Sequence, residues 1–196
     1  DDGDGVGYEI ATAARITNVN SITVVDAGDE TGDDADAPSG SDFTIDLTGY
    51  ATDLTIDASA LDAANEDNND DDTIDSDDYS EEILTITGVA AASLTVTGGS
   101  GADSITASTD IDNLSGGAGD DTFNFAGNLT YQDVVEGGDG TDILSVSGTQ
   151  ADVNFMKVSG VETVTLAGAA TNTFSAYFDA SGITTVNLDP DAVSTV

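Results

Sequence analysis

Short runs in which Thr is interspersed with Val, Ile or Leu recur along most of the chain and are separated by residues that favour turns. Runs rich in β-branched residues and bounded by Gly, Asp, Asn and Ser are typical of β-strands. The runs are residues 22–25, 43–47, 54–56, 83–87, 94–97, 159–166 and 181–188. Poor interior helix formers dominate the chain, so we expect little helix beyond one short segment at residues 58–66.

Several of these runs are near copies of one another. Residues 159–166 (SGVETVTL) are similar to residues 181–188 (SGITTVNL), and residues 18–24 are a looser copy. Repeats about 20 residues apart indicate stacked coils whose apolar residues share one continuous core. The chain has six Phe, five Tyr and no Trp, so Val, Ile, Leu and Thr must fill most of that core. We therefore predict an all-β fold of the parallel β-solenoid type.

The centre of the chain contains one nine-residue phrase several times. Full copies of the pattern G-G-x-G-x-D-x-U-x, in which U is apolar, occupy residues 98–106, 116–124 and 137–145. Degraded copies at residues 107–115 and 128–136 keep only the sixth-position Asp and the eighth-position apolar residue. This pattern is the repeat of calcium-binding β-helices. The centre is therefore predicted to be a β-roll segment of the solenoid.

The spacing of the copies predicts how they stack. With two nonapeptides per coil, the copies that begin at Gly98 and Gly116 are eighteen residues apart and lie on one side. Three extra residues, 125–127, delay the next coil, after which the copy that begins at Gly137 joins the same column. The eighth positions should point into the core. They are Ile105, Leu114, Phe123, Val135 and Leu144.

The residue types of the repeat suit a hard cation. Glycine lets the backbone adopt positive φ and turn its carbonyl oxygens toward one point, to which the sixth-position Asp adds a carboxylate. One turn supplies only part of a calcium shell of about six to eight oxygens, so stacked turns must share an ion. The expected ligand residues are Gly98, Gly99, Gly101, Asp103, Gly116, Gly117, Gly119, Asp121, Gly137, Gly138, Gly140 and Asp142. Asp112 and Asp133 of the degraded copies should lie across the core, where a weak cation site and a turn without an ion both stay open.

The charge of the chain supports the same expectation. There are 39 acidic residues and two basic ones, Arg15 and Lys157, which give a formal net charge of -37. Such a chain repels itself unless cations neutralise it, and it lacks the Lys and Arg clusters that bind nucleic acid or anionic membranes. The absence of Cys and His removes zinc, haem and nucleophile-pair chemistry. We therefore expect several Ca²⁺ ions, no nucleic acid partner and no enzymatic activity.

Two acidic stretches, residues 26–42 and 62–82, interrupt the strand pattern. Blocks of like charge favour disorder, whereas bound cations would order them, and both interpretations stay open. The strands on either side are alike, so we interpret the stretches as loops inserted into one continuous solenoid. Its predicted segments are rungs at residues 1–97, the nonapeptide segment at residues 98–147 and further rungs at residues 148–196.

The nonapeptides resemble those of the RTX family of exported bacterial proteins. The Thr-rich rungs, such as residues 161–166 (VETVTL), resemble those of β-solenoid S-layer proteins of Gram-negative bacteria that carry RTX repeats. The resemblance implies type I secretion, folding triggered by extracellular calcium, and self-association into a lattice on the cell surface. It also implies an anchor to a cell-surface glycan or lipopolysaccharide through another part of the protein. The alternative is a non-catalytic RTX module of a secreted adhesin or extracellular enzyme.

The expected location is extracellular, at the bacterial surface and without membrane insertion. No apolar run is long enough to span a membrane, and there is no signal peptide. The chain begins at Asp1 instead of Met and ends just after a strand-like run, so we interpret it as part of a longer protein.

Overall fold

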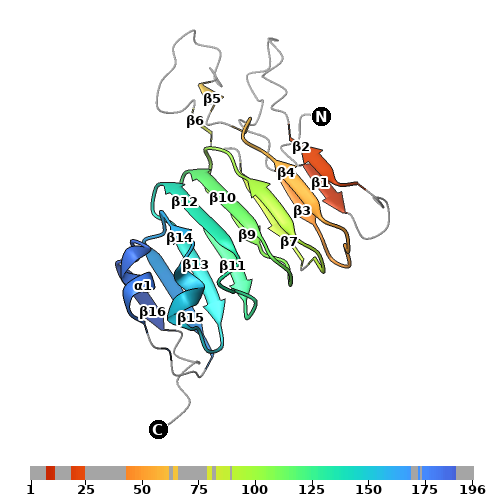
Figure 1. Cartoon of the computed structure of the whole chain (residues 1–196). Coiled ribbons are helices and arrows are strands. Elements are labelled where there is room, and N and C mark those ends of the chain that lie inside the picture. The colour runs from red at the N-terminus through yellow and green to blue at the C-terminus, as the bar shows by residue number, and fades with distance from the viewer. Residues whose placement is uncertain are drawn as a thin grey trace.

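Two parallel β-sheets face each other along the molecule, and from residue 84 to residue 159 each successive strand joins the opposite sheet (Figure 1). The computed structural model describes residues 8–11, 19–24, 43–61, 64–65, 79–80, 83–88, 90–168, 172 and 174–188. Every pairing within the two large sheets is parallel. The predicted all-β parallel β-solenoid is confirmed.

The strands follow one another in each sheet in the order of the coils. The eight-stranded sheet contains β1 (Tyr8–Ala11), β3 (Phe43–Asp46), β7 (Leu84–Thr87), β9 (Ser104–Thr106), β11 (Thr122–Ala126), β13 (Ile143–Ser147), β15 (Thr163–Ala167) and β16 (Thr185–Leu188). The six-stranded sheet contains β14 (Val158–Ser159), β12 (Val134–Asp139), β10 (Asn113–Ala118), β8 (Leu94–Thr97), β4 (Leu54–Asp57) and β2 (Ser21–Thr23). A separate antiparallel pair is formed by β5 (Ala64–Asn65) and β6 (Tyr79–Ser80).

The register of the sheets follows the phase of the nonapeptides. Phe123 pairs with Ile105 on one side and with Leu144 on the other. The first step is eighteen residues long and the second twenty-one, as the stacking of the copies predicts. A register shift between Asn124 and Ala126 marks the place where the longer coil leaves the regular ladder.

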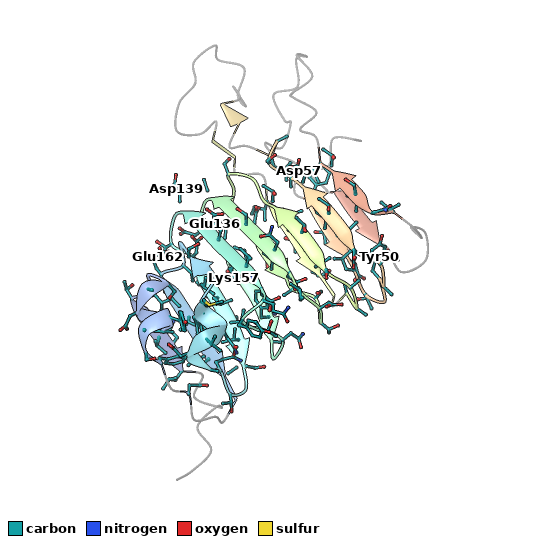
Figure 2. The ribbon with its side chains drawn as sticks, viewed as in Figure 1. Tyr50, Asp57, Glu136, Asp139, Lys157 and Glu162 are labelled. Carbon is teal, nitrogen blue, oxygen red and sulfur yellow. The ribbon has the colours of Figure 1, made fainter. Side chains whose placement is uncertain are left out.

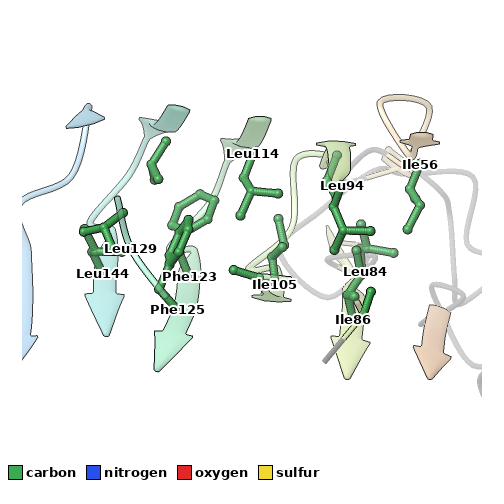
Figure 3. Close-up of a cluster of buried hydrophobic side chains, with 14 of the residues drawn as sticks. Ile56, Leu84, Ile86, Leu94, Ile105, Leu114, Phe123, Phe125, Leu129 and Leu144 are labelled. Carbon is green, nitrogen blue, oxygen red and sulfur yellow. The ribbon is translucent and has the colours of Figure 1, made fainter. Parts of the chain in front are cut away.

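The core lies between the sheets and is formed by one layer of apolar side chains from each of them. In Figure 3, Leu94 and Leu114 of the six-stranded sheet point toward the side chains of the eight-stranded sheet, among them Ile105 and Phe123. The five eighth-position residues are each 0% exposed, which confirms that they point inward. A layer one side chain deep on each face can be filled by Val, Ile and Leu with a few Phe, so the low aromatic content is sufficient.

Both acidic stretches lie in connections of one kind. The stretch at residues 26–42 falls between β2 and β3, and the stretch at residues 62–82 falls between β4 and β7. Each connection therefore passes from the six-stranded to the eight-stranded sheet. Apart from the short β5–β6 pair, the two stretches lie outside the described residues, and the predictions about their order stay predictions.

The helix predicted at residues 58–66 is wrong. Ala58 and Leu61 instead form a turn in which the Leu61 N–H donates to the Ala58 carbonyl (2.9 Å), and residues 64–65 belong to β5. Both side chains are buried against the core, so their spacing reflects a turn folded onto the apolar layer.

The described helical segments close the C-terminal end of the solenoid. The 3-10 helix η2 (Asp152–Phe155) precedes β14, and helix α1 (Ala176–Ala180) follows β15. The Phe178 ring of α1 packs edge-on against Phe155 (5.1 Å between centroids) and stacks on Phe174 (4.3 Å). Since the six-stranded sheet ends at β14, this aromatic cluster covers core that has no facing strand.

Asp152 of η2 holds the start of α1. Its carboxylate accepts hydrogen bonds from the backbone N–H and Oγ of Ser175 (2.7 and 2.8 Å) and from the N–H groups of Tyr177 (3.3 Å) and Phe178 (3.1 Å). Helices leave their first N–H groups without internal partners, and these bonds satisfy them. Desolvation is the largest single contribution and raises the pKa of Asp152, but the hydrogen bonds from Ser175, Phe178 and Tyr177 together outweigh it and lower that pKa.

Replacing Asp152 by Ala should lower the melting temperature by a few degrees. Helix α1 loses its N-terminal cap, and the packing of Phe178 in the aromatic cluster is weakened. Asp179→Ala is the matched control, since Asp179 lies exposed on the same helix. Thermal unfolding followed by near-ultraviolet circular dichroism measures both. Equal melting temperatures for the two variants would show that the cap does not hold the end of the solenoid.

Candidate metal centre

The three complete glycine turns stack along one edge of the solenoid. Each joins a strand of the six-stranded sheet to the next strand of the eight-stranded sheet. Gly117 pairs with Gly138, and the Ala118 N–H donates to the Gly99 carbonyl (3.0 Å). Figure 2 labels Glu136, Asp139 and Glu162 along this edge and Tyr50 along the opposite one.

The sixth-position aspartates of these turns form a hydrogen-bonded ladder. The Asp103 N–H donates to Asp121 Oδ1, and the Asp121 N–H donates to Asp142 Oδ1, both at 2.8 Å. At one end the Leu84 N–H donates to Asp103 Oδ1 (2.8 Å). At the other end the Asp142 N–H donates to Glu162 Oε2 (2.8 Å). The structure thus brings the three predicted aspartates into one column.

The second carboxylate oxygens of this column are not all satisfied. Asp103 Oδ2 accepts the Gly99 N–H (2.9 Å). Asp121 Oδ2 and Asp142 Oδ2 are buried, and neither has a hydrogen-bond partner. A buried carboxylate oxygen without a partner is costly, and a ligand of positive charge at this position would offset that cost.

The first-position glycines leave room for those oxygens. A Cβ on Gly116 would lie 1.9 Å from Asp121 Oδ2 and 2.8 Å from the Gly137 carbonyl oxygen. A Cβ on Gly98 would lie 2.2 Å from Asp103 Oδ2 and 2.1 Å from the Gly116 carbonyl oxygen. At each level a carboxylate oxygen and a carbonyl oxygen of the next turn therefore converge where any other residue would place its side chain.

The electrostatics of the column oppose ionisation without a cation. Burial raises the pKa of Asp121 to about 7, with further contributions from the neighbouring carboxylates of Asp103, Asp142 and Asp120. Burial also raises the pKa of Asp103 to about 6 and raises the pKa of Asp142, the latter helped by Glu162. A bound cation would reverse this balance, because opposite charge favours the carboxylate form.

The donor set fits calcium. Within the part of the chain that the structure describes, no three carboxylates gather around one point. An ion in the column would therefore take backbone carbonyl oxygens beside one or two carboxylates. Calcium accepts such mixed oxygen shells with flexible geometry, whereas magnesium demands a near-ideal octahedron.

The degraded copies form a second ladder on the opposite edge, and it differs from the first. Asp112 accepts the Leu94 N–H (2.8 Å), the Ser108 Oγ–H (2.6 Å) and the Ser108 N–H (2.9 Å). Asp133 accepts the Asp112 N–H (2.8 Å) together with the N–H (2.7 Å) and Oγ1–H (3.0 Å) of Thr130. Both side chains are 1% exposed, so they are not in solvent turns. Their full hydrogen bonding favours a ladder that needs no ion.

Two residues of the first column lie outside the nonapeptides and were not predicted. Gly160 carries a carbonyl oxygen that a Cβ on Gly137 would meet at 1.8 Å, and Glu162 accepts the Asp142 N–H. The available signal was only the approximate length of a coil, because Glu162 follows Asp142 by twenty residues, whereas the other steps of the ladder are eighteen and twenty-one. The nonapeptide pattern could not find them, since this turn lacks its second and fourth glycines.

Comparison of the chain with known protein families, with curated protein sequences and with solved structures finds no significant match. The fold and the site therefore define the class by themselves: a parallel β-solenoid with a column of buried carboxylates at its glycine turns. None of the helices among the described residues is both long and apolar enough to cross a membrane.

Proposed function

We propose that this chain is a calcium-stabilised structural segment of an extracellular bacterial surface-layer protein of the RTX type. The observation that carries the proposal is the buried, unpartnered oxygen Asp121 Oδ2, which lies beside Gly116 and the Gly137 carbonyl oxygen of the next complete glycine turn. A calcium ion beside this oxygen would offset the cost of burying its charge. Several ions in the column would do the same for a chain whose formal net charge is -37.

Calcium would act on folding through mass action. An ion that binds only the folded state stabilises it by about 2.7 kcal/mol per site at a hundred times its dissociation constant. Extracellular calcium modules bind in the range of about 10⁻⁴ to 10⁻³ M. The folded state would then be much less stable where calcium is scarce than outside the cell, where calcium is abundant.

The surface-layer role has its own support. Strands from before, within and after the nonapeptides share the same two sheets, which suits a structural element that extends along one axis. Calcium shared between acidic surfaces would join neighbouring copies into a lattice. The alternative is a non-catalytic module of a type I-secreted adhesin or enzyme. The full-length gene product distinguishes the two proposals, because a catalytic domain in it would favour the alternative.

Calcium titration of the EDTA-treated chain tests the first part of the proposal. We expect millimolar calcium to increase the β-sheet circular dichroism signal and to raise the melting temperature by several degrees. Magnesium at the same concentration and ionic strength should do much less. Identical spectra and melting curves in calcium and in excess EDTA would refute the proposal.

A pair of variants locates the effect in the column. Asp121→Asn keeps an oxygen that can accept the Asp103 N–H but removes the charge. The rise in melting temperature with calcium should then fall by about half or more, because the column holds few sites and Asp121 would be a ligand shared between stacked turns. Asp139→Asn removes the same charge from an exposed position on β12 and should respond to calcium as the wild type does. Electron microscopy with and without calcium then tests whether assembly follows the same dependence.

A further inference from the structure

The column of glycine turns continues for one turn beyond the last nonapeptide. Glu136 pairs with Ser159 before this turn, and Ile143 pairs with Thr163 after it. Residues 137–142 fill the gap in one coil, and residues 160–162 fill the same gap in the next. The fourth turn is therefore shorter, yet both ends lie in register with the third.

Glu162 does in this turn what an aspartate does in the others. The Asp142 N–H donates to Glu162 Oε2 at 2.8 Å, as the Asp121 N–H donates to Asp142 Oδ1 at 2.8 Å. Glu has one methylene group more than Asp, and this extra reach compensates for the shorter turn. The carboxylate ladder thus ends on Glu162 and not on the last aspartate of the repeat.

Gly160 supplies the matching carbonyl oxygen. A Cβ on Gly137 would lie 1.8 Å from the Gly160 carbonyl oxygen and 2.3 Å from Asp142 Oδ2. One level earlier, a Cβ on Gly116 would meet the Gly137 carbonyl oxygen and Asp121 Oδ2 in the same way. The two levels therefore present the same pair of oxygens, although only one of them lies between two complete nonapeptides.

Asp142 Oδ2 gives an independent reason to expect a ligand at this level. The Asp142 side chain is 0% exposed, and its Oδ2 is one of the two buried side-chain oxygens without a partner among the described residues. If cations stopped at the last complete pair of nonapeptides, this oxygen would remain buried and uncompensated. A Cβ on Gly137 would meet both this oxygen and the Gly160 carbonyl oxygen, and the Asp142 N–H donates to Glu162, so residues 160–162 border this level of the column.

We propose that Asp142 Oδ2, the Gly160 carbonyl oxygen and the Glu162 carboxylate form a further divalent cation site, suited to calcium, at a turn without the glycine motif. This site rests on the proposed calcium function and extends it past the repeat. Where a cation binds along this solenoid then depends on the position of a turn in the column and not on the complete glycine motif. A Gly-x-Glu turn can supply the remaining ligands of a site whose first ligand belongs to a nonapeptide.

Three variants separate a cation ligand from a plain hydrogen-bond acceptor. Glu162→Gln keeps an oxygen for the Asp142 N–H but removes the charge. Glu162→Asp keeps the charge but shortens the reach. Glu136→Gln is the matched control, because Glu136 is exposed on β12, on the same edge of the solenoid.

The test is the number of bound ions per chain, measured by native mass spectrometry in saturating calcium, together with melting temperatures in calcium and in EDTA. We expect Glu162→Gln and Glu162→Asp to hold one ion fewer than the wild type and to gain less from calcium. Glu136→Gln should match the wild type. The melting temperature of Glu162→Gln in EDTA should stay near that of the wild type.

The outcomes that would overturn this site differ from those that would overturn the calcium function. An unchanged ion count in Glu162→Gln, beside a lower count in Asp121→Asn, would leave the calcium function intact and exclude the site at residues 160–162. Equal destabilisation of Glu162→Gln with and without calcium would assign Glu162 a hydrogen-bonding role only. A wild-type chain that binds no calcium would refute the proposed function itself.

Discussion

Replacing Gly137 by Ala should lower the melting temperature in calcium by about 10 °C or more, as expected for severe overpacking in a domain of this size. The added methyl group would lie 1.8 Å from the Gly160 carbonyl oxygen and 2.3 Å from Asp142 Oδ2. The first neighbour is backbone in a paired coil, so it cannot move away without breaking the stack. Thermal unfolding followed by circular dichroism measures the loss.

The matched control is Gly127→Ala. Its added Cβ would meet only Ser147 Oγ, at 3.7 Å, which is ordinary contact. This variant should melt within a degree or two of the wild type. A Gly137→Ala protein that melts like Gly127→Ala would show that the first-position glycines are not required for close approach of the turns.

The calcium-free protein should melt about 10 °C lower at pH 8 than at pH 5. Solvent partly screens the carboxylates, so this difference is smaller than the raised pKa values alone would give. Burial raises the pKa of Asp103 to about 6 and that of Asp121 to about 7. In the unfolded chain the pKa values of both aspartates lie near 3.8. Between these limits the folded state binds more protons than the unfolded state, so stability falls as the pH rises. The contribution of these two aspartates to the stability of the folded state is fully present below about pH 4 and is lost as the pH rises through about 6 to 7.

Calcium should reverse the sign of this dependence. The ion binds the ionised carboxylates, so its stabilising effect should be largest at pH 8 and smallest at pH 5. Asp121→Asn should flatten the pH dependence of the calcium-free protein, because the group with the pKa of about 7 is gone. A calcium-free wild type whose melting temperature rises from pH 5 to pH 8 would contradict the assignment.

Much of the fold and three of the four carboxylates of the column, Asp103, Asp121 and Asp142, could be predicted from periodicity alone. The apolar eighth position and the Asp at the sixth position recur even where the glycines are lost, as at Asp112 and Leu114. In a solenoid, residues at one phase must stack, so the phase predicts both the buried layer and the ladder of aspartates. The sequence also predicted that the three extra residues 125–127 would lengthen one coil without moving the next copy out of the column, and Asp121 and Asp142 do stack.

The remainder depends on distances that no repeat pattern encodes. Glu162 was missed because a longer side chain replaces the residues absent from its turn. A difference between the two edges was predicted, but its basis was not, because it rests on the hydroxyl groups of Ser108 and Thr130, which satisfy one ladder. Helix α1 was missed because its first N–H groups are capped by Asp152, which lies more than twenty residues earlier.

The direction of the hydrogen bonds in the column gives the solenoid a polarity. In every step the N–H of one coil donates to the carboxylate of the following coil, from Leu84 through Asp103, and at the end from Asp142 to Glu162. Each coil is thus completed by its C-terminal neighbour. Removing a coil from the C-terminus would leave a backbone N–H without its acceptor, whereas removing a coil from the N-terminus would leave a carboxylate oxygen without its donor. The two ends of the column are therefore chemically different: a new C-terminal end needs a hydrogen-bond acceptor, and a new N-terminal end needs a donor or a cation.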